Sequence, residues 1–417
     1  MGLCLPVGRY HPHGRRHVVK AYAAVTAAYW AFMLSDGALR MLVLLHFNAL
    51  GFSPIQLAWL FLLYEAAGIV TNLAAGWIAA RFGLAATLYA GLGLQIAALA
   101  VLAQLDPAWS VAASVAFVMA VQGVSGVAKD LAKMASKSAV KVLAPEGRMF
   151  GWVAALTGSK NAVKGLGFFL GAAMLAVSGF QAAVWVMAGV LGIILLAVVL
   201  FLPEGLPMRN KEAAFAGWRS DDARINRLSL ARMFLFGARD VWFVVGSPVY
   251  FQMVLSDGSP DGRRWAFFVI GGFMAGWIML YGAVQAAAPR IVAGVDPTRA
   301  AIRWAGYLVP VPLVLAAMAL VAGDPALWLS LSLMAGLLLF GYVFAVNSAV
   351  HSYLILSYST AERVTRDVGF YYMSNAAGRL IGTLLSGVSY QFGGLALCLA
   401  TAGAMAAASW LAVRRLS

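Results

Sequence analysis

The chain has 417 residues, of which 62% are hydrophobic and only 11% carry a charge. Soluble domains contain about 25% charged residues, and disordered segments are poor in apolar residues, so this composition excludes both classes. The chain is also basic, with 30 Lys and Arg against 16 Asp and Glu and a formal net charge of +14. The apolar content indicates a membrane protein, and the basic excess needs a separate explanation.

Long apolar stretches predict where the chain crosses the membrane. A bilayer core of about 30 Å requires about 20 apolar residues in a helix. Segments of this kind predict twelve transmembrane helices, at residues 21–47, 55–80, 84–104, 108–128, 149–177, 180–202, 228–255, 265–288, 304–322, 326–350, 367–391 and 394–413. The fold class that follows is an all-α polytopic membrane protein.

Polar segments divide these helices into groups. Residues 1–20 form a polar, cytoplasmic tail without an apolar stretch, which is unlike a cleavable signal peptide. Residues 203–227 form the one long polar segment between predicted helices, and we interpret it as a cytoplasmic linker. The sequence therefore predicts two six-helix halves, at residues 21–202 and 228–417.

The distribution of Lys and Arg predicts the orientation in the membrane. With the N-terminus in the cytoplasm, 22 of the 30 basic residues lie on the cytoplasmic side, and only Arg263 and Arg264 lie outside. Cytoplasmic loops of membrane proteins carry an excess of Lys and Arg, so both termini are expected in the cytoplasm. Because these residues are dispersed between helices and form no single basic face, nucleic-acid binding is not expected.

The remaining charges lie within the predicted helices. An ionisable side chain at bilayer depth is costly unless it faces a cavity or a partner, so each is a candidate functional residue. The intramembrane cations are Arg40, Lys160, Lys164, Arg232, Arg239 and Arg379, and the acids are Asp36, Glu65 and Asp240. They occur in the predicted helices 1, 2, 5, 7 and 11, whereas helices 3, 6, 9 and 12 have none. This pattern predicts a central cavity lined by the charged helices and supported by the uncharged ones.

Helical spacing predicts how some of these charges are arranged. Asp36 and Arg40 are four residues apart and share a helix face, so they could form an ion pair. Arg239 and Asp240 are adjacent and point about 100° apart on a helix, so they are not expected to neutralise each other.

The fifth predicted helix combines two lysines with two glycines. Lys160, Lys164, Gly167 and Gly171 fall on one face, and the glycines favour close contact with another helix. Six intramembrane cations against three acids leave a formal charge of +3 in the predicted cavity. Arginine binds phosphate-like oxyanions through two parallel hydrogen bonds, and lysine supplies a point charge. The sequence therefore predicts a small substrate that carries several negative charges.

Other charged residues have simpler interpretations. Arg232 lies near a helix end and is expected to be a structural or snorkelling residue. Four lysines, spaced four residues apart, follow the fourth predicted helix: Lys129, Lys133, Lys137 and Lys141. We interpret them as an anchor to anionic lipid or as an electrostatic funnel for an anion. The histidines of the tail lack accompanying ligands, so neither a metal site nor a cofactor is expected: His11, His13 and His17.

The loop after the second predicted helix carries a family signature. The stretch from Gly76 to Gly83, GWIAARFG, resembles the G-x-x-x-D-R-x-G motif of the major facilitator superfamily, with Ala80 at the acidic position. The resemblance implies a major facilitator fold, in which two six-helix halves alternate in access to the two sides of the membrane. It also implies a gating role for Arg81.

More specific stretches are similar to one family within that superfamily, the organoarsenical efflux permeases (ArsJ). They are Asp36–His46, Ser125–Met134, Leu156–Lys164, Ala231–Trp242 and Gly369–Arg379. The resemblance implies export of 1-arseno-3-phosphoglycerate across a bacterial inner membrane, which confers arsenate resistance. A glyceraldehyde-3-phosphate dehydrogenase that uses arsenate makes this ester, so a functional link to that enzyme is implied. Only two cysteines are present, which agrees with an arsenic oxyanion and disfavours thiol-binding arsenite.

The expected site combines the residue patterns with this resemblance. The anion-binding candidates are Arg40, Lys160, Lys164, Arg239 and Arg379. The candidates for proton coupling or gating are Asp36, Glu65, Asp240 and Arg81. The expected partners are the small anion and the lipid bilayer, and the expected oligomeric state is a monomer.

Three other functions compete with this interpretation. A carrier or antiporter for another organophosphate or organic anion would have the same charged site, so it remains the nearest alternative. A proton-driven pump for hydrophobic drugs is disfavoured, because such a pump needs a mostly apolar cavity and this one has six cations. An enzyme is not expected, because no nucleophile, metal-ligand set or histidine–acid cluster occurs at one depth.

Overall fold

The computed structural model describes residues 12–143, 149–201, 220–359 and 364–416, and these ranges contain helices and no β-strand. The first part of the predicted tail, including His11, and most of the predicted linker lie outside the described residues. Within the described ranges, nine helices are long and apolar enough to cross a membrane. The predicted all-α class is confirmed.

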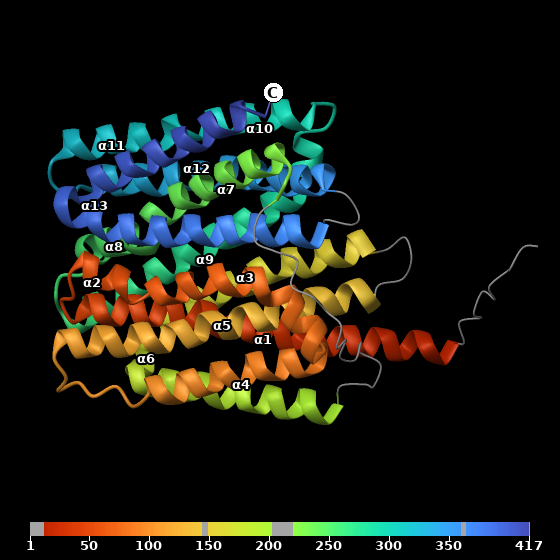
Figure 1. Cartoon of the computed structure of the whole chain (residues 1–417). Coiled ribbons are helices and arrows are strands. Elements are labelled where there is room, and N and C mark those ends of the chain that lie inside the picture. The colour runs from red at the N-terminus through yellow and green to blue at the C-terminus, as the bar shows by residue number, and fades with distance from the viewer. Residues whose placement is uncertain (1–11, 144–148, 202–219, 360–363, 417) are drawn as a thin grey trace, which may run out of the picture.

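The helices of the first half are α1 (Pro12–Ala49), α2 (Pro54–Trp59), α3 (Leu62–Phe82), α4 (Leu84–Leu102), α5 (Val111–Leu143) and α6 (Met149–Phe201). Those of the second half are α7 (Ala223–Val241), the π-helix η1 (Trp242–Gly246), α8 (Ser247–Leu255), α9 (Pro260–Ile291), α10 (Pro297–Leu308), α11 (Pro310–Ala322), α12 (Leu327–Tyr358) and α13 (Val364–Arg414). Figure 1 shows these helices side by side in one bundle, with the connections at its two ends. The start of α1 and the end of α13 lie at the same end, here called the terminal end, and the opposite end is called the distal end.

Two helices cross the bundle twice. α6 contains Gly179 with a φ of 77°, and α13 contains Gly393 and Gly394, the latter with a φ of 58°. Glycine adopts positive φ without a steric penalty, so each helix turns back at this point and has a first and a second arm (Figure 1). α2 with α3, α7 with η1 and α8, and α10 with α11 each form one interrupted crossing. Divided in this way, the described helices correspond to the twelve predicted crossings.

The helices α1 and α5 extend furthest beyond their predicted bounds. α1 begins at Pro12, so it includes the second part of the segment predicted as a polar tail. α5 continues to Leu143, fifteen residues beyond the predicted end of the fourth crossing at 128. No glycine or proline follows Gly126 before the helix ends, so nothing in the local sequence stops it. As a consequence, the lysine series predicted to follow the crossing belongs to the same continuous helix.

The first arm of α6 packs closely against α1. A Cβ atom added at Gly167 or Gly171 would overlap the backbone of α1 at Leu34 or Ala38. A Cβ at Gly37 of α1 would likewise lie 2.5 Å from the backbone oxygen of Lys164. The predicted glycine strip is confirmed, and it brings Lys164 directly beside α1.

The second arm of α6 faces away from the bundle. Its apolar side chains are exposed in the isolated chain, with Ile193 69% and Leu200 64% exposed. α11 is similar, with Val321 84% exposed. Apolar surface of this kind suits contact with lipid, so these segments form the outer layer of the membrane domain.

The two halves of the chain meet most extensively along two helix pairs, α6 with α9 and α3 with α13. Small residues allow both contacts. A Cβ at Gly165 would lie 2.8 Å from the backbone oxygen of Ala275, and one at Gly68 would lie 3.6 Å from the Cβ of Ala376. The space between these two contacts contains the cavity described next.

Candidate functional site

A cavity of about 220 Å³ lies in the centre of the bundle. Its lining comes from α1, α3, α5, the first arm of α6, α7, η1, α9, α12 and the first arm of α13. Among the residues that the structure describes, α4, α10, α11 and the second arms of α6 and α13 contribute none. The predicted helices that carry intramembrane charges therefore line the cavity, and, in the described ranges, the predicted helices 3, 6, 9 and 12 do not. α9 and α12 also line it, although their predicted crossings at 265–288 and 326–350 carry no charge.

The cavity is strongly cationic. The basic residues that line it, counted over the described ranges, are Arg40, Lys129, Lys133, Lys160, Lys164, Arg232, Arg239 and Arg379. The acids that line it are Glu65, Asp130 and Asp240, and Asp36 adds a fourth carboxylate by binding Lys164. Eight cations against four carboxylates leave a formal charge of +4, one more than predicted. Each uncompensated ion taken out of water costs several kcal/mol.

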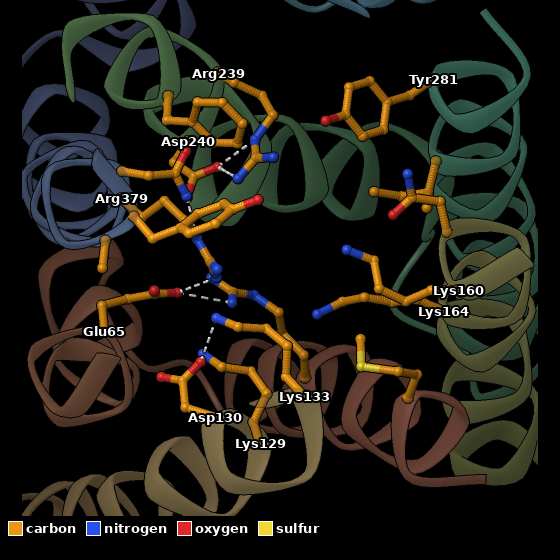
Figure 2. Close-up of a pocket in the computed structure, with 18 of the residues that line it drawn as sticks. Glu65, Lys129, Asp130, Lys133, Lys160, Lys164, Arg239, Asp240, Tyr281 and Arg379 are labelled. Atoms are coloured by element: carbon orange, nitrogen blue, oxygen red, sulfur yellow. Dashed lines mark hydrogen bonds and ion pairs between the residues drawn. The ribbon is translucent and has the colours of Figure 1, made fainter. Parts of the chain in front are cut away.

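Arg379 connects the charges of the two halves. Its Nη2 donates to Oε1 of Glu65 on α3 over 2.6 Å, and its Nε donates to Oδ2 of Asp240 on α7 over 3.4 Å. Arg40 also donates to Oε1 of Glu65, over 2.9 Å. Figure 2 shows Glu65, Arg379 and Asp240 joined by contacts across the cavity wall. The first and second halves are therefore joined at the centre by ion pairs.

Arg239 and Asp240 form an ion pair, and the prediction that they would not neutralise each other is wrong. Arg239 Nε and Nη2 both lie 2.5 Å from Oδ1 of Asp240. The arginine side chain is long enough to fold back along the helix surface, so the angle between neighbouring Cβ atoms does not separate the charged groups. The helix also changes to a π-helix two residues later, at Trp242.

Asp36 and Arg40 do not pair, so the i,i+4 ion pair predicted for them is also wrong. Asp36 accepts from Nζ of Lys164 over 2.5 Å and from the hydroxyl of Tyr64. Arg40 instead pairs with Glu65. The close packing of α6 on α1 brings Lys164 to Asp36, and α3 supplies Glu65 on the other side. Partners from neighbouring helices therefore replace the local one.

The lysines of α5 contribute to the cavity. Lys129 lies with Nζ 4.0 Å from the ring centroid of Tyr64. Lys133 Nζ lies 2.7 Å from Oδ1 of Asp130 and 2.5 Å from Oδ1 of Asn72. The interpretation of Lys129 and Lys133 as anchors to anionic lipid is therefore wrong. The side chains of the last two members of the series lie outside the described residues: Lys137 and Lys141.

Asp130 is a site residue that the sequence analysis did not select. It is fully buried, and its Oδ2 accepts from the hydroxyl of Thr71 over 2.6 Å. The available signal was an acid beside lysines in a helix that is otherwise apolar. Because the predicted crossing ends at 128, residues 129–141 are expected in the cytoplasm, and Asp130 does not count among the intramembrane charges.

Arg232 is not a snorkelling residue. Only 5% of its surface is exposed, and it lines the cavity. Its Nη1 donates to the backbone oxygen of Ser348 over 2.9 Å and to Oγ of Ser348 over 3.0 Å, and its Nε donates to Asn375 over 3.1 Å. The guanidinium lies 4.1 Å from the ring centroid of Phe236. Its position is thus fixed by neutral groups of three different helices.

Neutral polar residues complete the lining. Asn161 of α6 donates to Oε1 of Gln285 on α9 over 3.1 Å, and Tyr29 and Tyr281 also face the cavity. These residues could not be selected from the sequence, because an amide or a phenol does not stand out in an apolar helix as a charge does. Figure 2 shows Lys160 and Lys164 extending into the cavity from one wall, opposite the wall that carries Lys129, Lys133 and Arg379.

Arg81 is not part of this site. It lies in the last turn of α3 at the terminal end, and it is absent from the cavity lining among the described residues. In the same ranges, no group of three or more His, Cys, Asp or Glu side chains is placed to hold a metal ion.

The cavity extends from the middle of the bundle toward the terminal end. Tyr29, Lys133 and Gln285, for example, lie in the terminal-end parts of their helices. At the distal end the two halves touch, where Asn48 Nδ2 donates to Oε1 of Gln252 over 2.7 Å. α13 also packs on α2 there, since a Cβ at Gly387 would lie 2.5 Å from the backbone oxygen of Pro54. The bundle is therefore closed at the distal end.

Comparisons with known proteins show which family and which solved structures this fold resembles. A model of the Major Facilitator Superfamily matches residues 25–350. The structure is similar to a nucleoside transporter, NupG, with a TM-score of 0.68, 13% identity, and 95% and 98% of the two chains covered. It is similar to the human organic anion transporter MFSD10 (TETRAN), with a TM-score of 0.62, 20% identity, and coverage of 97% and 100%.

A third similar structure is a bacterial homologue of the iron transporter ferroportin in an inward-facing state. Its TM-score is 0.71, its identity is 11%, and 95% of this chain and 98% of that chain are covered. The comparison with curated proteins finds no match. At these identities the three structures show the fold, and the match to the superfamily covers well over half of the residues. The chain belongs to the major facilitator superfamily.

Proposed function

We propose that this chain is a secondary transporter that moves a small, multiply charged organic anion by alternating access. The observation that carries the proposal is the central cavity, where eight cations from both halves face four carboxylates in the described ranges. Arginine and lysine are the side chains that bind oxyanions. Membership of the superfamily implies a carrier rather than an enzyme. The organic anion transporter among the similar structures is consistent with this class of substrate.

Within this class we propose 1-arseno-3-phosphoglycerate as the substrate and export as the direction. The support is the resemblance to organoarsenical efflux permeases, together with where the resembling stretches lie. Each of the five stretches carries cavity-lining charges: Arg40; Lys129, Asp130 and Lys133; Lys160 and Lys164; Arg232, Arg239 and Asp240; and Arg379. The substrate has a phosphoryl and an arsenyl group, and cations on two facing walls suit an anion with a charge at each end.

The geometry supports a role for the buried acids in gating. Glu65 and Asp240 hold Arg40, Arg239 and Arg379 in place when no anion is bound. A substrate oxyanion that enters the cavity competes for the same guanidinium groups, which loosens the ion pairs between the halves. The proposed location is the bacterial inner membrane, with both termini in the cytoplasm. The cavity then faces the cytoplasm and receives an anion made there.

The nearest alternative is a carrier for another organophosphate. The cavity favours a multivalent anion, and its charges do not distinguish an arsenyl from a phosphoryl group. The two proposals differ in cells, where only the arsenylated substrate produces arsenate resistance.

The test uses an arsenate-sensitive bacterial strain that expresses a glyceraldehyde-3-phosphate dehydrogenase and therefore forms the arsenylated ester. Expression of this chain should restore growth in arsenate and lower the arsenic content of the cells. Lys164→Ala and Arg239→Ala should abolish both effects while the protein still inserts. Arg264→Ala is the matched control, since Arg264 is an exposed residue at the distal end whose side chain is 61% exposed.

Unchanged growth and arsenic content with the intact chain would exclude the arsenylated substrate. Full activity of Lys164→Ala and Arg239→Ala would refute the proposed binding site but not the proposed substrate.

A further inference from the structure

We propose that this carrier is an obligate anion exchanger, which returns to its starting state only with a phosphate-like oxyanion bound from the opposite side. The inference rests on the proposed anion-transport function and adds the coupling mode and the counter-substrate. It is argued from the contacts of the buried acids and cations described above.

The buried carboxylates are already engaged. Asp36 contacts Lys164 and Tyr64, and Glu65 accepts from two arginines. Asp130 contacts Lys133 and Thr71, and Asp240 contacts Arg239 and Arg379. Protonation of any of these four acids would break an ion pair and raise the positive charge of the cavity. A proton is therefore a poor companion for an anion at this site.

The cations, by contrast, are not fully compensated by protein groups. Arg232 is held by Ser348 and Asn375 and packs on aromatic rings, and Lys129 lies over the ring of Tyr64. These contacts are with neutral groups and leave the charge in place. Glu65 and Asp240 each contact two arginines, and Arg379 is common to both. The residues that line the cavity, together with Asp36, carry a formal excess of +4.

This excess has different consequences for the loaded and the empty carrier. Alternating access requires the cavity to close before it opens to the other side. Closing an empty cavity removes water from uncompensated cations, which is unfavourable. A bound oxyanion supplies the missing negative charge, so the loaded carrier closes readily. After an anion is released, rapid return therefore needs a second anion from that side.

The counter-substrate has to satisfy the same side chains. Arginine guanidinium and lysine ammonium groups on facing walls suit a tetrahedral oxyanion. The cavity of about 220 Å³ is large enough for a small oxyanion. Inorganic phosphate has this chemistry, and it is the probe for the test. Export of an organic anion would then be exchanged for phosphate entering from outside.

The test uses the full chain reconstituted in liposomes that contain radiolabelled phosphate. The vesicles are diluted into medium with phosphate or into medium whose only anion is a bulky sulfonate buffer. Efflux into phosphate should be at least about tenfold faster, the factor that about 1.4 kcal/mol of barrier gives. A protonophore or an imposed pH gradient should leave the exchange rate unchanged. Equal efflux into both media, efflux that needs a pH gradient, or no phosphate transport in either medium would overturn the inference.

Two neighbouring residues of opposite charge provide matched variants. Lys129→Gln lowers the excess by one charge and should raise net efflux relative to exchange. Asp130→Asn raises the excess by one charge and should lower that ratio. Arg264→Gln, at the exposed distal end, should leave the ratio unchanged. If Lys129→Gln and Asp130→Asn changed the ratio of net efflux to exchange in the same direction, the charge explanation would be contradicted, even if both variants are less active.

This experiment separates the inference from the proposed function. Absence of phosphate exchange together with restored growth in arsenate would refute the exchanger and leave the organoarsenical carrier. Strong phosphate exchange without any arsenate resistance would support the exchanger and refute the arsenylated substrate.

Discussion

Arg379 occupies the position at which the charges of the two halves meet. One guanidinium contacts Glu65 of the first half and Asp240 of the second, over 2.6 and 3.4 Å. A planar guanidinium carries N–H donors in a fixed fork, so different edges of the same group can contact two carboxylates at once. The side chain is 18% exposed, so it is also accessible to an anion in the cavity.

Replacement of Arg379 by lysine should therefore be harmful although the charge is kept. An ammonium group has one nitrogen, so it lacks the separate Nη2 and Nε donors through which Arg379 reaches Glu65 and Asp240. The loss of a hydrogen bond to a charged group costs about 1.5–3 kcal/mol. We expect Arg379→Lys to lower the transport rate in reconstituted vesicles by at least about tenfold. Arg264→Lys is the control at an exposed site. Wild-type transport by Arg379→Lys would show that the bridge between halves is dispensable.

At this scale the sequence identified the charged residues but not their partners. An ionisable group in an apolar helix is visible in the sequence, and eight of the nine selected residues are in the cavity lining or bound to it, with Arg81 as the exception. Which acid meets which base depends on how the helices pack. Asp36 illustrates this, because its partner Lys164 is 128 residues away and comes near only through the packing of α6 on α1.

Helix contacts in this bundle depend on small residues. The packing of α6 on α1 leaves no space for a Cβ at Gly171, where the neighbouring backbone of Ala38 lies directly against the glycine. In contrast, the second arm of α6 contains Gly189, which has no atom of another residue within 4 Å of an added Cβ. The same helix therefore offers a test position and a matched control.

Gly171→Ala should destabilise the protein, because an added methyl group in a tightly packed interior costs about 1–3 kcal/mol. Thermal unfolding in detergent should occur at a lower temperature than for the wild-type chain. Gly189→Ala should unfold at the wild-type temperature or above it, since alanine favours the helix more than glycine does. Equal unfolding temperatures for the two variants would mean that the close contact between α1 and α6 is absent in solution.

The sequence predicted the helices well and their irregularities poorly. Crossing positions follow from apolar length, and the structure agrees to within a few residues at most of them. The π-helix at Trp242–Gly246 was not predicted. It depends on a distant hydroxyl, because Oγ of Ser386 accepts from the N–H groups of Val245 and Gly246 over 3.1 and 3.2 Å. No local pattern in the sequence reports such a contact.

Among the described residues, contacts between the two halves close the central cavity at the distal end. Ion pairs join the halves at the centre, and Asn48 and Gln252 join them at the distal end. Alternating access requires the distal contact to separate once in each transport cycle. A covalent link across this contact should therefore stop transport.

The link can be made with Asn48→Cys and Gln252→Cys in a Cys4→Ser background, where the remaining Cys398 is buried. A short bifunctional thiol reagent should abolish transport by the double variant, and a reagent with a reducible bond should allow recovery on reduction. Each single-cysteine variant should keep its activity after treatment. Full transport by the linked protein would show that the distal end does not open during the cycle.

Orientation in the membrane is a second property of the whole molecule. Ala108 lies in the exposed loop between α4 and α5 at the distal end, and Ala293 lies in the exposed loop between α9 and α10 at the terminal end. In intact cells that express the Cys4→Ser background, a membrane-impermeant thiol reagent should label Ala108→Cys and not Ala293→Cys. The reverse pattern would place the termini outside and would contradict the proposed direction of export.

The hairpins of α6 and α13 have a consequence for how such a carrier can diversify. In each hairpin the first arm supplies cavity residues, and the second arm supplies none among the residues described. Changes of cargo preference are therefore expected to accumulate on the first arms, whereas adaptation to bilayers of different thickness is expected on the second arms. A single glycine turn in each half separates these two kinds of change, so each can proceed without loss of the other.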